Sequence, residues 1–370
     1  GNPVPDVPVY FTLMKKPGKG GSLAVLNGVT DAEGMARADL ETDGSKTGSY
    51  EVLAEVADPE RGYTVRGIVF KEMALNRLGL VVGVLGGLGI FLFGMKLMSD
   101  GLQHIAGNRL KGILHFLTRN RFAAVGAGTV VTGLIQSSSA CTVMVVGFVN
   151  AGLLSLRQAI GVIFGANIGT TVTGQMVSFK LTGLALPAIA VGMAVILVAR
   201  RSKVKNAAQA VLGFGLLFLG MTMMSSELKS IASFPTFRDI FQFFDCTPAV
   251  GGGMPVGAIL GSLAIGTVMT VMVQSSSATI GLTIALADSG LINFYTAVPL
   301  ILGDNIGTTV TALLASIGTN RRARQAAVAH TIFNLLGAAY MCVLFYVPVG
   351  GVPVFLNLVN NITSGDVFAA

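Results

Sequence analysis

Long apolar runs fill the chain from Leu78 onward, and their lengths predict a polytopic, α-helical membrane protein. About 20 apolar residues are enough for a helix to cross a bilayer. Several runs approach or exceed that length. These predicted spans are residues 78–98, 155–177, 182–199, 206–225, 291–316 and 325–347.

Two further apolar stretches, 121–152 and 250–288, differ because Gln-Ser-Ser-Ser interrupts each of them near its middle. A polar break at bilayer depth is tolerated only where it is buried in protein or lines a cavity. We therefore predict two re-entrant helical hairpins. Each enters and leaves on one side of the membrane, with the serines at its tip.

Residues 1–75 have another pattern, in which short β-rich runs are separated by turn clusters such as TDAEG and ADPERG. A spacing of roughly 8–12 residues between strands is typical of a small β-sandwich. The predicted strands are residues 7–13, 22–27, 34–40, 49–56 and 63–70. The Thr-Asp-x-x-Gly turn and the Gly-x-Tyr-x-Val pattern resemble the bacterial immunoglobulin-like modules of invasin-type proteins. That resemblance implies an extracytoplasmic module, either a passive spacer or a binder of a periplasmic or cell-wall partner.

The membrane part contains an internal repeat. Gln136 precedes Gly165 by 29 residues, and Gln274 precedes Gly303 by the same 29. Three pairs of segments match in order, the first offset by 126 residues and the later two by 138, which places a 12-residue insertion in the second copy. The pairs are FLFGMKLMSDGL (91–102) with LFLGMTMMSSEL (217–228), QSSSACTV (136–143) with QSSSATIG (274–281), and GANIGTTVT (165–173) with GDNIGTTVT (303–311). We name residues 76–204 the first copy and 205–348 the second copy.

If the hairpins do not cross, the first copy has three spans, so the second copy is inverted relative to it. Inverted copies with broken helices are typical of secondary transporters. With the β module outside, twelve basic residues fall on the cytoplasmic side and three outside, as the positive-inside rule expects. The twelve are Arg109, Lys111, Arg119, Arg121, Arg157, Arg200, Arg201, Lys203, Lys205, Arg321, Arg322 and Arg324; the three are Lys180, Lys229 and Arg238.

Composition agrees with this interpretation. The chain is 52% hydrophobic and 12% charged, about half the charged fraction usual in soluble domains. The net charge of +7 is then a topology signal and not a sign of nucleic-acid binding. Three cysteines, Cys141, Cys246 and Cys342, argue against a disulfide framework. Cys246 is either an apolar core residue or a partner for another chain.

The two tips carry chemistry that suits a small anion. Hydroxyl groups at the start of a half-helix lie beside free N–H groups and a positive dipole end. The candidate substrate ligands there are Ser137, Ser138, Ser139, Ser275, Ser276 and Ser277. Gly169 and Gly307 predict that Asn-Ile-Gly-Thr-Thr forms a second helix break. Its candidate substrate ligands are Asn167, Asn305, Thr170 and Thr308.

Neither motif pair contains Lys or Arg, and an uncompensated anion at mid-membrane is costly. Co-bound cations would neutralise it, which favours Na⁺ coupling and leaves H⁺ open. Asp304 replaces Ala166 of the first copy, so the second copy is expected to hold the more charged cation site. The candidate Na⁺ ligands are Gln136, Gln274, Asp304, Asn305, Thr171 and Thr309. These oxygen donors suit no transition metal, and no organic cofactor is expected.

Other polar residues have simpler explanations. Lys96 is predicted to extend from the last turn of the first span to the cytoplasmic surface, and Met95 to pack. Residues 107–120 are predicted to form an interfacial helix. His330 and Asn334 share a helix face at i, i+4, which indicates an interhelical hydrogen bond or a second-tier ligand role.

The doubled QSSSA and NIGTT, together with AVAHTIFNLLG at 327–337, resemble the sodium-dependent phosphate cotransporter family, in its bacterial branch and its animal type II branch. The resemblance spans roughly residues 80–347 and implies Na⁺-driven uptake of inorganic phosphate across the bacterial inner membrane. It places the tip serines and glutamines, and Asn167, Thr170, Asn305 and Thr308, in the substrate and sodium segments, with His330 and Asn334 second-tier. An N-terminal β module is not part of the family's core pattern. Many bacterial members continue into a cytoplasmic regulatory domain, so this chain is expected to be either truncated or a short member, with residues 349–370 returning as part of another span.

Other functions remain in competition. The near alternative is a Na⁺- or H⁺-coupled carrier of another small oxyanion or carboxylate. A membrane-anchored adhesion or wall-binding protein would need only a simple anchor. No enzyme is expected, and a serine hydrolase in particular is disfavoured because G-x-S-x-G is absent from the sequence. Stoichiometry, electrogenicity, selectivity against arsenate or sulfate, and a homodimeric state stay open.

Overall fold

The computed structural model describes residues 3–18, 20–42, 48–58, 63–74, 76–106, 120–179, 181–232, 234–248, 253–349, 352–355, 359 and 361. The chain divides into two units, Gly1–Val84 and Leu85–Ala370, and the boundary falls within helix α1 (Arg77–Ala106). Each unit is described by itself. The predicted interfacial helix 107–120 and most of the C-terminal segment lie outside the described residues.

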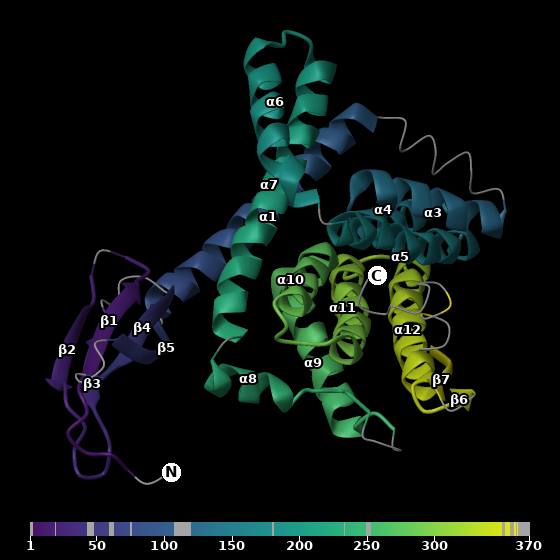
Figure 1. Cartoon of the computed structure of the whole chain (residues 1–370). Coiled ribbons are helices and arrows are strands. Elements are labelled where there is room, and N and C mark those ends of the chain that lie inside the picture. The colour runs from purple at the N-terminus through teal and green to yellow at the C-terminus, as the bar shows by residue number, and fades with distance from the viewer. Residues whose placement is uncertain are drawn as a thin grey trace. The chain divides into compact units, whose positions relative to one another are not determined.

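The first unit contains a three-stranded and a two-stranded β-sheet (Figure 1). Strand β4 (Gly48–Asp58) lies between β1 (Val9–Lys15) and β5 (Tyr63–Ala74), antiparallel to both, and β2 (Ser22–Asn27) pairs with β3 (Arg37–Glu41). The five strands expected from the alternating pattern are therefore confirmed. Whether the module is immunoglobulin-like stays a prediction.

The turn before β3 forms as its residues predict. Asp31 Oδ1 accepts hydrogen bonds from the backbone N–H of Glu33 (3.1 Å) and of Met35 (2.8 Å). Gly34 has φ of +74°, a left-handed conformation that glycine adopts without steric cost. An Asp side chain that bonds to its own following backbone stabilises such turns.

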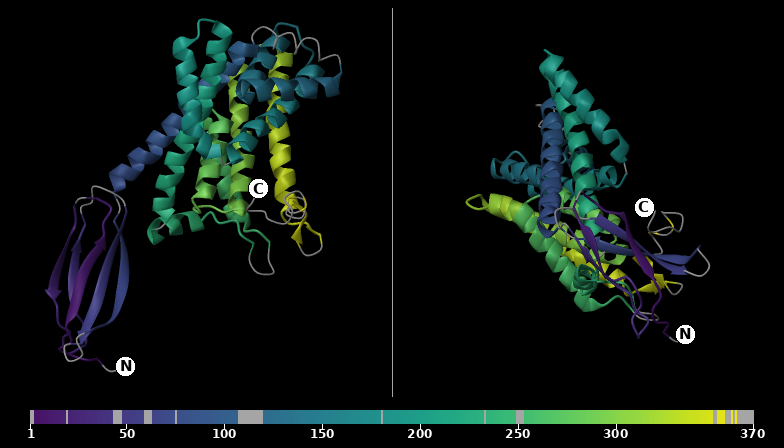
Figure 2. Two further views of the ribbon diagram at one scale, coloured as in Figure 1. Left: turned by 45° about the horizontal axis from the view of Figure 1, so that its top comes forward. Right: turned by 60° about the vertical axis from the view of Figure 1, so that its left-hand side comes forward.

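The second unit is almost entirely helical (Figures 1 and 2). Its helices after α1 are α3 (Arg121–Ile135), α4 (Ser138–Asn150), α5 (Leu156–Ser178), the 3₁₀ turn η1 (Leu181–Leu184), α6 (Ala185–Val198), α7 (Ser202–Ala232), α8 (Pro235–Gln242), α9 (Val256–Val273), α10 (Ser276–Asp288), α11 (Phe294–Ala315) and α12 (Arg321–Leu344). Two short strands, β6 (Pro348–Val349) and β7 (Val352–Pro353), pair after α12.

Among the described residues, seven helices are long and apolar enough to cross a membrane. Six of them coincide with the predicted spans, because apolar length is a local property that sequence reports directly. The seventh is α9, which was predicted to be the first arm of the second hairpin. Its counterpart α3 has only 15 residues and falls short of that length.

Helices α1 and α7 cross with their backbones in contact. A Cβ atom on Gly94 would collide with the backbone of Gly213 and Leu217, and one on Gly220 with the backbone of Gly87 and Phe91. Gly87 and Gly94 are offset by 126 residues from Gly213 and Gly220, as in the sequence repeat. The crossing is therefore reciprocal, and small residues allow the close approach that drives helix association in membranes.

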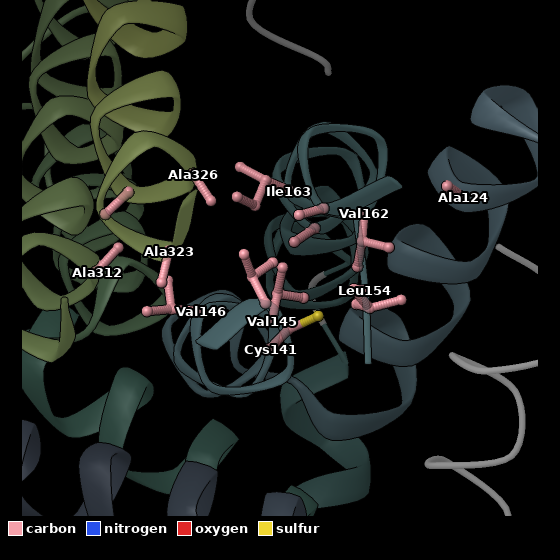
Figure 3. Close-up of a cluster of buried hydrophobic side chains, with 14 of the residues drawn as sticks. Ala124, Cys141, Val145, Val146, Leu154, Val162, Ile163, Ala312, Ala323 and Ala326 are labelled. Atoms are coloured by element: carbon pink, nitrogen blue, oxygen red, sulfur yellow. The ribbon is translucent and has the colours of Figure 1, made fainter. Parts of the chain in front are cut away.

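A large buried apolar cluster among the described residues joins helices from both copies. Val145 of α4 and Ile163 of α5 lie against Ala323 and Ala326 of α12, and each of the four is at most 1% exposed (Figure 3). Cys141 lies in the same cluster and is a free thiol, as is buried Cys246. Cys141 packs as a small apolar residue, which is the commoner role of a lone cysteine, whereas Cys246 Sγ also donates to the carbonyl of Phe244 (3.5 Å).

The predicted break at Asn-Ile-Gly-Thr-Thr is wrong. Helices α5 and α11 run without interruption through both copies of this motif. Gly169 and Gly307 serve close packing instead, since a Cβ on either would lie 2.6 Å from a carbonyl oxygen of the neighbouring helix, Thr129 O in α3 or Thr267 O in α9.

Candidate functional site

The two Gln-Ser-Ser-Ser tips have the same backbone conformation. Gln136 ends α3 with φ 59° and ψ 27°, and Gln274 ends α9 with φ 59° and ψ 22°, both left-handed. Ser137 and Ser275 then cap α4 and α10 by accepting hydrogen bonds from the N–H of Ala140 (3.2 Å) and Ala278 (3.3 Å). A non-glycine residue in this conformation costs about 1–3 kcal/mol, and such strain concentrates at functional sites.

Both tips line one cavity of about 240 Å³, which also receives a face of α1. Each tip presents the first turn of a helix to it, and these turns carry free N–H groups and a positive dipole end. The lining residues are Leu92, Met95, Lys96, Ser99, Gln136, Ser137, Ser138, Ser139, Gln274, Ser275, Ser276 and Ser277. The eight tip residues expected from the sequence to share a site are thus brought together.

Lys96 lies in the wall of this cavity, a position that its predicted place in the last turn of the first span did not indicate. The cavity therefore holds a fixed positive charge that the motifs themselves lack. Ser99, one turn further along α1, donates a hydrogen bond to the carbonyl of Ile135 (2.5 Å) at the end of α3. This bond holds the face of α1 that carries Lys96 against the first tip.

The two tips differ in how their glutamines are held. Gln136 is 6% exposed, and its Oε1 accepts a hydrogen bond from Thr173 of α5 (2.7 Å). Gln274 is exposed and donates only within its own turn, to the carbonyl of Val271 (3.2 Å). A side-chain contact therefore anchors the first tip to a neighbouring helix, and the second tip has no equivalent contact among the described residues.

Asp304 lies outside the cavity lining, in a buried network behind the second tip. It is 1% exposed, and its Oδ1 accepts a hydrogen bond from Thr270 (3.0 Å). Thr279 Oγ1 lies 3.0 Å from both Thr270 Oγ1 and the carbonyl oxygen of the tip residue Ser276. Asp304 Oδ2 has no hydrogen-bond partner among the described residues. A buried carboxylate oxygen without a partner is costly and fits a cation ligand.

The first copy replaces this network by less polar residues. At the offset of 138, the counterparts of Thr270, Thr279 and Asp304 are Thr132, Cys141 and Ala166. The hydroxyl of Thr132 is buried without a hydrogen-bond partner in the described part of the chain. The residues directly behind the tip therefore include a carboxylate in the second copy and none in the first.

The remaining predicted ligands do not reach the cavity. Asn167 donates to Asn334 Oδ1 (2.8 Å), and His330 Nε2 lies 3.3 Å from Asn167 Oδ1, so these three residues join α5 to α12. Asn305 is half-buried on α11. The four threonines bond back to carbonyls of their own helices: Thr170 to Ala166, Thr171 to Ile168, Thr308 to Asp304 and Thr309 to Ile306. The six predicted Na⁺ ligands therefore do not form one cluster.

Sequence reasoning missed the contribution of α1. Leu92, Met95, Lys96 and Ser99 follow at i, i+3, i+4 and i+7, which places them on one helix face. That face lies within the first matched segment of the repeat, and this was the signal that could have indicated a functional role. In the part of the chain that the structure describes, no three His, Cys, Asp or Glu side chains form a metal cluster.

Helices of membrane-spanning length around a polar cavity built from two matched helix tips are typical of a membrane transport protein. The chain belongs to the Na⁺/Pi-cotransporter family, whose sequence profile matches residues 90–226 and 256–350. The match includes both tips, Lys96 and Asp304.

Individual relatives agree with this assignment. YqeW of Bacillus subtilis (strain 168), whose name assigns no function, is 31% identical over 249 residues, which cover 67% of this chain and 77% of that protein. YjbB of Escherichia coli (strain K12), provisionally named as an inorganic phosphate export protein, is 28% identical over 69% of this chain and 45% of its own length. The rabbit (Oryctolagus cuniculus) sodium-dependent phosphate transport protein 2A is 34% identical over 134 residues, 35% of this chain and 20% of that protein. The chain thus spans less than half of the Escherichia coli relative. No solved structure matches it.

Proposed function

We propose that this protein is a secondary active carrier that binds inorganic phosphate in the cavity between its two Gln-Ser-Ser-Ser tips and couples its movement to Na⁺. The observation that carries the proposal is that both tips, 138 residues apart, line one cavity. Serine hydroxyls, glutamine amides and two helix N-termini are the donors that an oxyanion requires.

The proposed mechanism is alternating access by two inverted copies. Identical tip conformations and the reciprocal α1–α7 crossing support a two-fold relation between the copies. Contacts of α5 with α10 and of α11 with α4 support it further, since each pair joins one copy to the other. We propose that α3–α4 and α9–α10 are re-entrant hairpins, which leaves three spans in each copy.

Asp304 is the proposed centre of a Na⁺ site in the second copy. Its unpartnered Oδ2, the Thr270 hydroxyl and the Thr279 hydroxyl that reaches the Ser276 carbonyl are hard oxygen donors within one network. Such donors suit an alkali cation. This arrangement couples cation binding directly to the backbone of the substrate tip.

Uptake by purified protein in proteoliposomes tests the proposal. We expect saturable uptake of radiolabelled phosphate that requires an inward Na⁺ gradient and is not supported by K⁺. Uptake that persists without a Na⁺ gradient would refute Na⁺ coupling, and a separate H⁺ gradient tests the alternative driving ion. Sulfate and arsenate as competitors define the selectivity.

Direction is part of the proposal, and we propose import with residues 1–75 outside the cell. The name of the Escherichia coli relative favours export as the second candidate. Vesicles of the two membrane orientations, loaded with phosphate on one side and Na⁺ on either side, distinguish the two directions. Accessibility of a cysteine introduced at exposed Tyr10 to an impermeant reagent in intact cells tests the placement of the β module.

A further inference from the structure

We propose that Lys96 is the anion-binding cation of the central cavity, and that its ammonium group contacts the oxygens of a bound, negatively charged tetrahedral oxyanion. The inference rests on the proposed function and adds to it a charged ligand that neither repeat motif contains. It also changes the electrostatic account, because co-bound Na⁺ is then not the sole source of compensating positive charge.

The position of Lys96 carries the inference. Lys96 lines the cavity together with the six serines of both tips. Its neighbours on the same helix face, Met95 and Ser99, are 6% and 9% exposed, whereas Lys96 is exposed. The hydrogen bond from Ser99 to Ile135 fixes this face of α1 against the first tip. The ammonium group thus extends from a helix that is held in place at the cavity.

The charges around the cavity also favour contact between Lys96 and an anion. The tip side chains that line the cavity are neutral, and the two helix N-termini together contribute only about one positive elementary charge. No carboxylate lies within ion-pair distance of Lys96 among the described residues. An ammonium without a protein counter-ion, in a cavity of hydrogen-bond donors, attracts an anion and repels a cation.

The charge belongs to one copy only. At the offset of 126, the counterpart of Lys96 is Thr222, whose hydroxyl donates to the carbonyl of Phe218 in its own helix (2.8 Å). Among the described residues, the cavity therefore receives one lysine, from the first copy. Asp304, in contrast, is present only in the second copy. The first copy thus supplies the positive charge for the anion, and the second copy supplies the negative charge for the cation.

The competing explanation is that Lys96 only forms an ion pair within α1, with Asp100 four residues further on. Asp100 is not among the cavity-lining residues. Four variants of the full chain in proteoliposomes separate the two: Lys96→Gln, Lys96→Arg, Asp100→Asn and Lys205→Gln. Lys205 is exposed at the start of α7 and controls for the loss of one positive charge.

We expect Lys96→Gln to raise the KM for phosphate about 10- to 100-fold, the range for loss of a charge-assisted hydrogen bond. Lys96→Arg should restore the KM for phosphate to within severalfold of wild type, because arginine keeps the positive charge. The half-saturating Na⁺ concentration of Lys96→Gln should stay within about twofold of wild type, which would show that Lys96→Gln is folded. Asp100→Asn and Lys205→Gln should match wild type.

An unchanged KM in Lys96→Gln, or an equal loss in Asp100→Asn, would overturn the role of Lys96 and leave phosphate transport standing. If Lys96→Gln lost phosphate and Na⁺ dependence together and Lys96→Arg did not restore them, a structural role would replace the proposed one. Wild-type protein without saturable phosphate uptake would overturn the proposed function and this inference together.

Discussion

Asparagine in place of Asp304 alters one atom and one charge in the buried network behind the second tip. The amide can keep the hydrogen bond from Thr270 Oγ1, which spans 3.0 Å in the wild-type protein. What disappears is the anionic oxygen, and Oδ2 has no hydrogen-bond partner among the described residues. Any change in transport therefore reports on the proposed cation site more than on packing.

The magnitude follows from the lost contact. Contacts to charged groups contribute about 1.5–3 kcal/mol each, and a tenfold change in affinity corresponds to about 1.4 kcal/mol. We expect the half-saturating Na⁺ concentration of Asp304→Asn to rise about 10- to 150-fold. Asp304 is 1% exposed, so solvent screening does not diminish the effect.

The assay is phosphate uptake at fixed phosphate concentration over a range of Na⁺ concentrations, with reversal potentials giving the number of Na⁺ ions moved per phosphate. Asp288→Asn is the matched control, since Asp288 ends α10, the helix that carries Thr279, and forms an ion pair with Lys229 (2.8 Å) away from the network. Unchanged half-saturating Na⁺ together with an unchanged ion-to-phosphate ratio would refute the assignment of Asp304 to a cation site.

Two further predictions concern packing and tip geometry. Gly94→Ala forces a methyl group into the α7 backbone and should lower the unfolding free energy by about 1–3 kcal/mol. In the control variant Gly89→Ala the added atom meets open space, so the unfolding free energy should not fall. Thermal unfolding in detergent measures both variants, and equal behaviour of the two would contradict the reasoning. Thr173→Val removes the donor to Gln136 and should raise the KM for phosphate about fivefold, for a loss of about 1 kcal/mol. Thr311→Val removes a hydroxyl that donates only within its own helix, so an equal effect there would contradict a role of the Thr173 bond in the site.

The sequence predicted those features of the fold that depend on local pattern. Apolar length located the six spans, and alternation with turn residues located the five strands. The Gln-Ser-Ser-Ser interruptions marked the places where α3 gives way to α4 and α9 to α10, because a polar run in an apolar stretch has few structural solutions.

Features that depend on tertiary contacts were not predictable in the same way. Gly169 permits either an unwound backbone or a close helix contact, and only the neighbouring Thr129 carbonyl decides for the contact. The sequence did not place Lys96 in the cavity wall, because the direction of its side chain depends on the rotation of α1 about its axis. That rotation is fixed in part by the hydrogen bond from Ser99 to the carbonyl of Ile135, which lies 36 residues further along the chain.

The α1–α7 crossing limits how this protein can change. Most packing defects in a core can be repaired by a compensating mutation, in which a larger residue on one side is matched by a smaller one opposite. At Gly94 and Gly220 the opposing atoms belong to the main chain, so no substitution on the other helix can make room. A side-chain mutation on the opposite helix therefore cannot compensate for a larger residue at either glycine. A laboratory search for suppressors of Gly94→Ala should find only changes that move a whole helix.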